Sequence, residues 1–363
     1  MFFKTIFIHF PFLVFILTLF TFVRPCCPTR RSAGLWSAFL LVCAAKFLAF
    51  AAFGGDAFNP VFPERLMWVW NWAYSGLVIL FVLSLAGFFL PRRVRLVILP
   101  AVAWTLSAWG VWSGVRAPDV REIDFSHASV PKELNGYRIC QITDTHVSAA
   151  ARGWRTREIV RRVNGAAADL VVCTGDIVDG KVADLAEDVA PLRELSARDG
   201  VYYVTGNHEH YCDADAWQAL FARWGFRFLT DACVIPRSGL ALGGLAEPMS
   251  DGFRVRRAPE AGRMFADATN GEFRVILQHR PQWARENAAV ARANLQLSGH
   301  THGGVMPVLN LLVRHHNQGF VRGLYDLGEG SFLYVSPGTG QWAGFPVRFF
   351  NNPEITVFTL HSL

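Results

Sequence analysis

The stretch Val201-Tyr202-Tyr203-Val204-Thr205-Gly206-Asn207-His208-Glu209 decides the fold, because an apolar run leads directly into polar side chains. Residues 201–204 have the β-branched and aromatic composition of a buried strand. Asn207 and His208 follow at its end, where an amide and an imidazole contribute little to stability, so they indicate a functional role. Other apolar runs of the chain also end in Asp, Asn or His. This repeated pattern predicts one site that is built from several strand ends.

The composition separates a membrane part from the rest of the chain. The protein has 363 residues, of which 52% are hydrophobic, and the apolar excess lies mostly before residue 115. Its mean hydropathy is positive, which is unusual for a purely soluble protein. The net charge of +6 is consistent with attraction to anionic lipid or to phosphate groups. Arginines in loops beside membrane spans are a second explanation for much of that charge.

Four apolar segments, 6–23, 34–53, 66–90 and 96–115, are each about as long as the roughly 20 residues that a transmembrane helix needs. We therefore predict four transmembrane helices within residues 1–115. The first segment also resembles a signal peptide, but no cleavage site of small residues follows it. Lys46 interrupts the second segment, and it either extends to the membrane surface or faces the helix bundle.

The loops between these segments predict the orientation of the chain. The loops after the first and third segments are rich in arginine, whereas the loop after the second has no net positive charge. The positive-inside rule places the two arginine-rich loops in the cytoplasm. The large domain is then expected on the outer face of the inner or plasma membrane.

Residues 116–136 read as a polar linker, and residues 137–363 read as a globular domain. Helical patterns alternate with strands early in this domain, and strands dominate later, which predicts an α/β fold with a mixed sheet or two sheets. Helices are expected over 154–168, 182–197 and 213–224. Strands are expected over 138–143, 170–173, 201–204, 240–245, 273–278, 295–298, 332–335 and 355–360.

The seven cysteines form no metal-binding or redox motif. Cys140 and Cys173 fall within predicted core strands, where cysteine usually packs as a small hydrophobic residue. Cys212 and Cys233 could form a disulfide bond if the domain lies in an oxidising compartment.

Five polar blocks follow predicted strands, and ligands of α/β proteins bind beyond the carboxyl ends of strands. Taken singly, each block has a structural explanation, such as a turn or a core histidine. Together they place too many costly polar groups at strand ends for packing alone. Their oxygen and imidazole donors suit Mn, Fe, Zn or Mg, and seven donors suit two ions better than one. The blocks are Asp144-Thr145-His146, Gly175-Asp176-Ile177-Val178-Asp179, Gly206-Asn207-His208-Glu209, His279, and Gly299-His300-Thr301-His302.

These five blocks, in this order, resemble the calcineurin-like metallophosphoesterase family. The resemblance covers residues 138–304, and the tail at 321–325 and 338–340 resembles the family's bacterial membrane-associated or exported branch. It implies a four-layer α/β/β/α sandwich, here preceded by a four-helix transmembrane region.

The resemblance also implies roles for individual residues. One divalent metal ion would be bound by Asp144, His146, Asp176 and His302, and a second by Asp176, Asn207, His279 and His300. His208 would contact the phosphate and assist the leaving group as the catalytic residue. Asp179 would orient a neighbouring side chain, and Glu209 and Arg280 are weaker candidates, with Arg280 facing either substrate phosphate or a surface carboxylate.

The chain departs from the usual pattern of this branch at two positions. Thr145 stands where leucine is common, and Pro337 stands where arginine is common. The proline could remove a cation that contacts substrate, so it bears on substrate identity rather than on the metal centre.

The expected function is metal-dependent hydrolysis of a phosphodiester or pyrophosphate bond by a membrane-anchored enzyme. The anchor favours a lipid-linked or envelope-linked substrate, and no nucleic-acid partner is expected. An alternative is a broad phosphomonoesterase or nucleotide phosphodiesterase that acts near the membrane. A receptor that uses the fold only for binding is disfavoured, because binding alone does not require the complete ligand set.

Overall fold

The computed structural model describes residues 2–248, 261–266, 268 and 271–363. The chain divides into two compact units. The helical unit comprises Met1–Val115 together with Ala343–Arg348, and the α/β unit comprises Arg116–Trp342 together with Phe349–Leu363.

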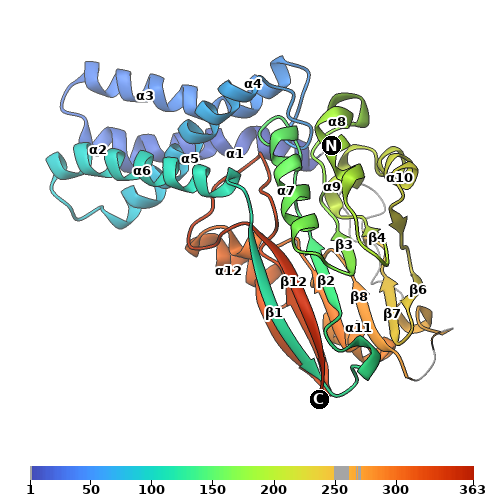
Figure 1. Cartoon of the computed structure of the whole chain (residues 1–363). Helices are drawn as coiled ribbons and strands as arrows, with labels where there is room; N and C mark the ends of the chain where they lie inside the picture. Colours follow the sequence, from blue (N-terminus) through green and yellow to red (C-terminus); the bar gives the residue numbers. More distant parts are fainter. Residues whose placement is uncertain (1, 249–260, 267, 269–270) are drawn as a thin grey trace. The chain divides into compact units, whose positions relative to one another are not determined.

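Apolar helices make up the helical unit (Figure 1). Three helical segments are long and apolar enough to cross a membrane: Phe7–Cys26, Glu64–Ala86 and Arg92–Val115. Helices α3 and α4 form a fourth span if they are counted as one, since they are bent by 53° at a single-residue break. The four predicted transmembrane segments therefore correspond to three helical spans and one bent pair. The elements are α1 (Phe2–Thr18), the π-helical turn η1 (Leu19–Val23), α2 (Arg24–Cys26), α3 (Arg30–Ala44), α4 (Lys46–Ala52), α5 (Glu64–Ala86) and α6 (Arg92–Val115).

Lys46 faces the inside of the helical unit and is fully buried. Its Nζ donates hydrogen bonds to the carbonyl oxygens of Ala343 and Gly344, at 2.7 and 2.9 Å. The rings of Phe47, Phe50 and Tyr74 surround it at 5.1 to 5.5 Å. Of the two possibilities for Lys46, the structure shows the one in which the side chain points into the bundle.

The first sheet of the α/β unit has the order β1-β12-β2-β3-β4-β5. Strands β2 to β5 run parallel, so their carboxyl ends meet along one edge, whereas β12 runs antiparallel to β2 and parallel to β1. The strands are β1 (Asp119–His127), β2 (Arg138–Ile142), β3 (Leu170–Thr174), β4 (Val201–Val204), β5 (Arg227–Phe228) and β12 (Glu354–Ser362).

The second sheet has the order β10-β11-β9-β8-β7-β6. Its four central strands β11, β9, β8 and β7 are parallel, and an antiparallel strand lies at each edge. The strands are β6 (Ala232–Arg237), β7 (Leu240–Gly244), β8 (Phe273–Leu277), β9 (Leu295–Ser298), β10 (Gly323–Gly328) and β11 (Ser331–Val335).

Alternating side chains of each strand build the layers between these sheets and their helices. Ile139 packs between the two sheets with Val275 of the second, while the next residue, Cys140, packs against Ile159 of helix α7. On the far side of the second sheet, Ile276 packs against Ala291 of helix α11. The predicted four-layer α/β/β/α sandwich is confirmed. The main helices are α7 (Gly153–Gly165), α8 (Val182–Val189), α9 (Asn207–Cys212), α10 (Ala214–Arg223), α11 (Ala284–Ala291) and α12 (Pro307–His316), with 3-10 turns η2 (Lys132–Leu134), η3 (Ala190–Glu194), η4 (Ala261–Arg263) and η5 (His302–Gly304).

The predicted linker at 116–136 contains strand β1, which the sequence pattern did not reveal. Most side chains of Asp119–Asp124 are partly or fully exposed, so this part of the strand lacks the apolar signal of its neighbours. It forms by pairing with β12, more than 200 residues later in the chain. The possible pairing of Cys212 with Cys233 is also absent, since no disulfide bond joins them in the part of the chain that the structure describes.

Candidate metal centre

The polar blocks predicted at strand ends lie on loops that leave the two sheets. Asp144 and His146 follow β2, and Asp176 follows β3. Asn207 and His208 open helix α9 directly after β4. The second sheet supplies the remaining histidines: His279 follows β8, and His300 and His302 follow β9. The carboxyl ends of parallel strands meet at one edge of each sheet, which explains how residues far apart in the sequence become neighbours.

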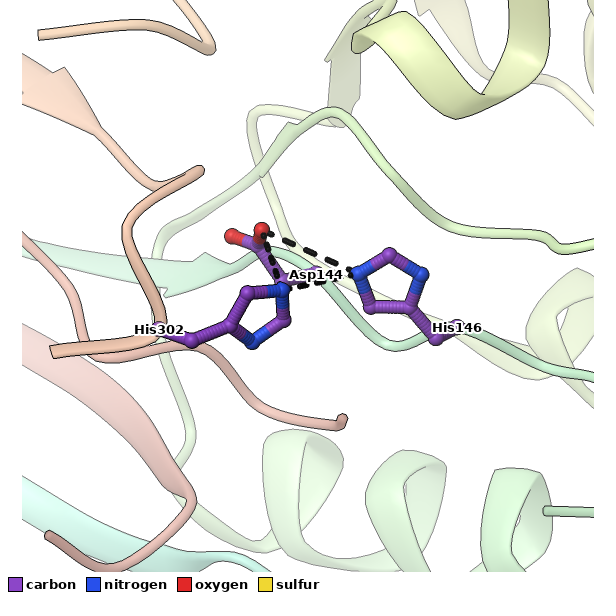
Figure 2. Close-up of side chains that lie close together, drawn as sticks. All are labelled: Asp144, His146 and His302. Carbon is purple, nitrogen blue, oxygen red and sulfur yellow. Dashed lines mark hydrogen bonds and ion pairs between the residues drawn. The ribbon is translucent and has the colours of Figure 1, made fainter. Parts of the chain in front are cut away.

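Asp144, His146 and His302 form one group of potential metal ligands (Figure 2). The Nε2 atoms of His146 and His302 are 3.1 Å apart. Both lie near Asp144 Oδ1, at 3.9 Å for His146 and 3.5 Å for His302. In Figure 2 the two rings turn these nitrogens toward the same carboxylate. Three donor atoms therefore converge on one point, as ligands of a single cation do.

Asp176, His279 and His300 form a second group. His279 Nε2 lies 3.1 Å from Asp176 Oδ2, and His300 Nδ1 lies 3.2 Å from His279 Nε2. The same Asp176 oxygen is 3.9 Å from Nε2 of His146, which belongs to the first group. Asp176 is thus within reach of imidazoles from both groups.

Outer hydrogen bonds orient the rings of His146 and His279. Asp179 Oδ1 accepts a hydrogen bond from His146 Nδ1 at 2.8 Å, and the main-chain oxygen of Thr174 accepts one from His279 Nδ1 at 2.8 Å. In both rings this hydrogen bond holds Nδ1 and leaves Nε2 as the nitrogen that points into the site. This arrangement is typical of histidines that bind metals.

His208 shares the same carboxylate. Its Nδ1 donates to Asp179 Oδ1 at 2.6 Å, and its main-chain N–H donates to Asp176 Oδ1 at 2.8 Å. Its ring also lies against the rings of Tyr211 and Trp342, with centroids 5.1 and 5.9 Å away. These contacts hold the imidazole in one orientation and leave Nε2 facing Asp176 Oδ2 at 3.9 Å.

Burial and neighbouring charges shift the pKa values of the site residues in opposite directions. Burial lowers the pKa of the His208 imidazole, but Asp176 and Asp179 outweigh it and raise the pKa to about 9. Burial raises the pKa of the Asp176 carboxyl, but His279 and His208 outweigh it and hold the pKa well below its usual range. Burial raises the pKa of Asp144 despite the nearby His279. At neutral pH, Asp176 is therefore ionised and His208 carries a proton on each ring nitrogen.

The backbone is strained at five of the proposed metal ligands. Residues other than glycine rarely adopt positive φ, and such strain concentrates at functional sites. Glycine is required at two positions that lie against these ligands. A Cβ on Gly206 would overlap Asp176 Oδ1, and a Cβ on Gly299 would overlap Asp144 Oδ2. Five proposed ligands have φ between 46° and 72°: Asp144, His146, Asp176, His300 and His302.

The residues present fit a divalent cation. The side-chain oxygen of Asn207 is buried and accepts no hydrogen bond, which is costly unless a ligand completes its environment. The other donors are carboxylates and imidazoles, the set preferred by Mn, Fe, Zn and Mg rather than by soft metals. A third group of potential ligands, His146, Asp179 and His208, is also buried and shares His146 with the first.

Glu209 has a structural role that its position in the sequence did not define. Its carboxylate accepts hydrogen bonds from the main-chain N–H groups of Asp176, Ile177, Val178 and Gly206, at 2.6 to 3.3 Å. It therefore joins the loop after β3 to the start of helix α9.

Arg280 pairs with a carboxylate, but the partner is buried rather than on the surface. Its Nε donates to Oε1 of Glu247 at 2.5 Å, and the Glu247 side chain is fully buried. Its Nη1 lies 3.3 Å from His300 Nε2, so a cation borders the second group of donors. Sequence reasoning missed Glu247, although it follows strand β7 in the same strand-end pattern that marked the other blocks.

Comparisons with known proteins agree with this geometry. A family model described as calcineurin-like phosphoesterase matches residues 137–304.

Three relatives illustrate the similarity. The "Transmembrane protein with metallophosphoesterase domain" of Danio rerio is 31% identical over 268 residues, which cover 70% of this chain and 60% of that protein. An uncharacterized metallophosphoesterase of Campylobacter jejuni is 31% identical over 253 residues, covering 68% of this chain and 64% of that protein. The uncharacterized metallophosphoesterase YkuE of Bacillus subtilis is 30% identical over 248 residues, covering 64% of this chain and 82% of that protein.

The chain thus spans 60% and 64% of the length of the first two relatives, but most of YkuE. The match to the family model includes the five polar blocks and strands β2 to β9. The chain belongs to the calcineurin-like phosphoesterase family.

Proposed function

We propose that the protein is a membrane-anchored phosphoesterase that hydrolyses a phosphodiester or pyrophosphate bond with two divalent metal ions. The observation that carries this proposal is the convergence of two donor groups on Asp176, whose Oδ2 lies within 3.9 Å of imidazole nitrogens from both. Asp144, His146, Asp176 and His302 would hold one ion. Asp176, Asn207, His279 and His300 would hold the other.

When bound, two such ions stabilise negative charge on a phosphate and lower the pKa of a water molecule. The chain's own residues supply the remaining chemistry. His208 keeps its Nδ1 proton in the hydrogen bond to Asp179, which leaves the Nε2 proton for a substrate oxygen. As the leaving oxygen gains negative charge, a hydrogen bond or proton from Nε2 stabilises it. In the described part of the chain no serine or cysteine is placed as a nucleophile, and direct attack by water requires none.

The test uses the full chain in detergent with Mn²⁺. Hydrolysis of bis-p-nitrophenyl phosphate is compared with that of p-nitrophenyl phosphate, and Asp176→Ala and His208→Ala are assayed in parallel. We expect the diester to be the better substrate and both variants to lose activity. Absence of hydrolysis of either substrate by metal-loaded protein would contradict the enzymatic role.

The membrane anchor supports a substrate in or near the bilayer. The helical unit contains three helices, or four with the bent pair, that are long and apolar enough to span a membrane. We propose that the α/β unit acts on a lipid-linked or envelope-linked phosphate ester on the outer face. A reporter protein fused after Leu363 tests the orientation, and a strong cytoplasmic signal would overturn it.

A further inference from the structure

Helix α12 starts shortly after the candidate ligand His302 and presents leucines to solvent. Leu311 is 70% exposed and Leu312 is 57% exposed. The next turn is basic, and Arg314, His315 and His316 are all exposed. Adjacent leucines and basic residues on the free surface of one helix are typical of helices that lie at a membrane interface.

A second exposed apolar side chain belongs to the same corner of the α/β unit. Phe350 is 76% exposed. Its loop is attached next to the start of α12, because Phe349 N–H donates to the Val305 oxygen at 3.1 Å and Asn351 Nδ2 donates to the His302 oxygen at 2.6 Å. Hydrogen bonds therefore tie this loop to His302 and to Val305, shortly before α12 begins.

Acidic residues are absent from the two segments that carry these side chains, while Asp119 of β1 and Glu354 of β12 line a pocket beside Arg322 and Phe350. The chain from His300 to Tyr325 contains no aspartate or glutamate, and neither does the loop from Thr339 to Asn352. Arg322 is exposed and donates a hydrogen bond from Nη1 to the Phe350 oxygen at 3.0 Å, which fixes a guanidinium beside the exposed ring. We call Leu311, Leu312, Arg314, His315, His316, Arg322 and Phe350 the apolar–basic face.

We propose that the apolar–basic face docks on an anionic lipid bilayer, with the leucines and Phe350 entering the interface and the arginines contacting lipid phosphates. Arginine near an anionic membrane surface is attracted to it, and apolar side chains add affinity by leaving water. Attachment to membrane spans in the same chain keeps the effective lipid concentration high, so weak docking suffices. The proposal rests on the proposed membrane location of the chain, but not on its hydrolytic activity.

Docking in this way has a consequence for the candidate metal centre. His302 is separated from the start of α12 by only four residues. A phosphate carried by a lipid headgroup would then reach the metal centre without leaving the bilayer surface.

The experiment uses the full chain in lipid nanodiscs, with a dansyl amino acid incorporated at position 311. Position 290 is the matched control, because Val290 is 61% exposed but lies on α11, which precedes the amino end of β9 rather than following its carboxyl end. Nitroxide-labelled lipids quench the probe if it enters the bilayer. Nanodiscs of phosphatidylcholine alone are compared with nanodiscs that also contain phosphatidylglycerol.

We expect quenching at position 311 to be several times stronger than at position 290, to rise with phosphatidylglycerol, and to fall in the Arg314→Glu/Arg322→Glu variant. Equal quenching at the two positions, or quenching that is independent of anionic lipid, would overturn the proposal. A blue-shifted spectrum without lipid quenching would overturn it as well. It would show that a second copy covers the face if the shift depends on protein concentration, and that the chain itself covers it otherwise.

Quenching is also measured in the His208→Gln background, where we expect the same result. In the wild-type chain, absence of hydrolysis with quenching retained would count against the proposed enzymatic role alone. Hydrolysis with no quenching would count against bilayer docking alone. Circular dichroism and bound metal content report whether each labelled chain has folded.

Discussion

The two donor groups of the candidate metal centre are alike in composition, but they are held in different ways. In the group around Asp144, a side chain orients the histidine, because His146 donates to the Asp179 carboxylate. In the group around Asp176, the main chain does so, because His279 donates to the carbonyl oxygen of Thr174. The first support can be removed by a single substitution, whereas the second is built into strand β3.

Asp179, the carboxylate that orients the first group, has a second partner. Asp179 Oδ1 accepts from His146 at 2.8 Å and from His208 at 2.6 Å, so one oxygen orients both a proposed metal ligand and the proposed proton donor. A negative partner also makes an imidazole more basic than a neutral carbonyl does. The orientation of His146 is therefore coupled to that of the proposed proton donor His208, whereas His279 is oriented by the main chain.

The largest effect is expected where both groups meet. Asp176→Ala removes the carboxylate within reach of both, so hydrolysis of bis-p-nitrophenyl phosphate should fall by more than the roughly 100-fold typical of losing an outer-sphere partner. Bound metal, measured by mass spectrometry, should fall as well. Diester hydrolysis that survives Asp176→Ala would contradict the assignment of two ions sharing this residue.

The next effect separates proton transfer from metal binding. His208→Gln should lower the rate by about 10²- to 10⁴-fold, the usual contribution of a general acid, while metal content stays unchanged. The imidazole is protonated below its pKa of about 9, so the wild-type rate should fall as the pH rises through about 9. His208→Gln should lack this alkaline decline. The same decline in the variant would show that another group causes it.

A smaller effect is expected from breaking the support of one group only. Asp179→Ala should weaken binding of one ion by about 10- to 100-fold, as measured by Mn²⁺ titration, and leave the other ion bound.

Thr174→Val is the matched change at the residue that supports the Asp176 group. It removes the Thr174 hydroxyl that accepts from Gln141 Nε2 at 2.9 Å, but keeps the carbonyl that orients His279. Its metal affinity should match that of the wild type. If Asp179→Ala weakens the binding of both ions equally, the two groups are not supported independently.

The smallest effect concerns stability rather than chemistry. Glu209→Gln keeps the shape of the side chain but replaces one acceptor oxygen with an NH₂ group that faces main-chain N–H donors. Leaving these buried donors without an acceptor should cost about 1 to 3 kcal/mol in the free energy of unfolding, measured by urea denaturation. A variant as stable as the wild type would show that water replaces the lost acceptor.

Much of the fold could be predicted because its signals are local. Val201–Val204 and Leu170–Thr174 begin as short apolar runs that end at threonine and glycine, and both are strands. Strand β1 has no such signal over its first six residues, none of which is buried, and it depends on pairing with β12. Local composition identifies strands that are buried on both faces, but not edge strands that a distant partner stabilises.

The sequence by itself determined the kinds of donor atoms, their positions after strands, and the presence of long apolar segments, because each of these is encoded by neighbouring residues. Only the tertiary structure decided that Asp179 serves both His146 and His208, that Glu247 neutralises Arg280, and that Lys46 bonds to the carbonyls of Ala343 and Gly344. The Lys46 contacts join residues nearly 300 positions apart. The physical reason is that hydrogen-bond partners are selected by the geometry of packed sheets and helices, which no local pattern specifies.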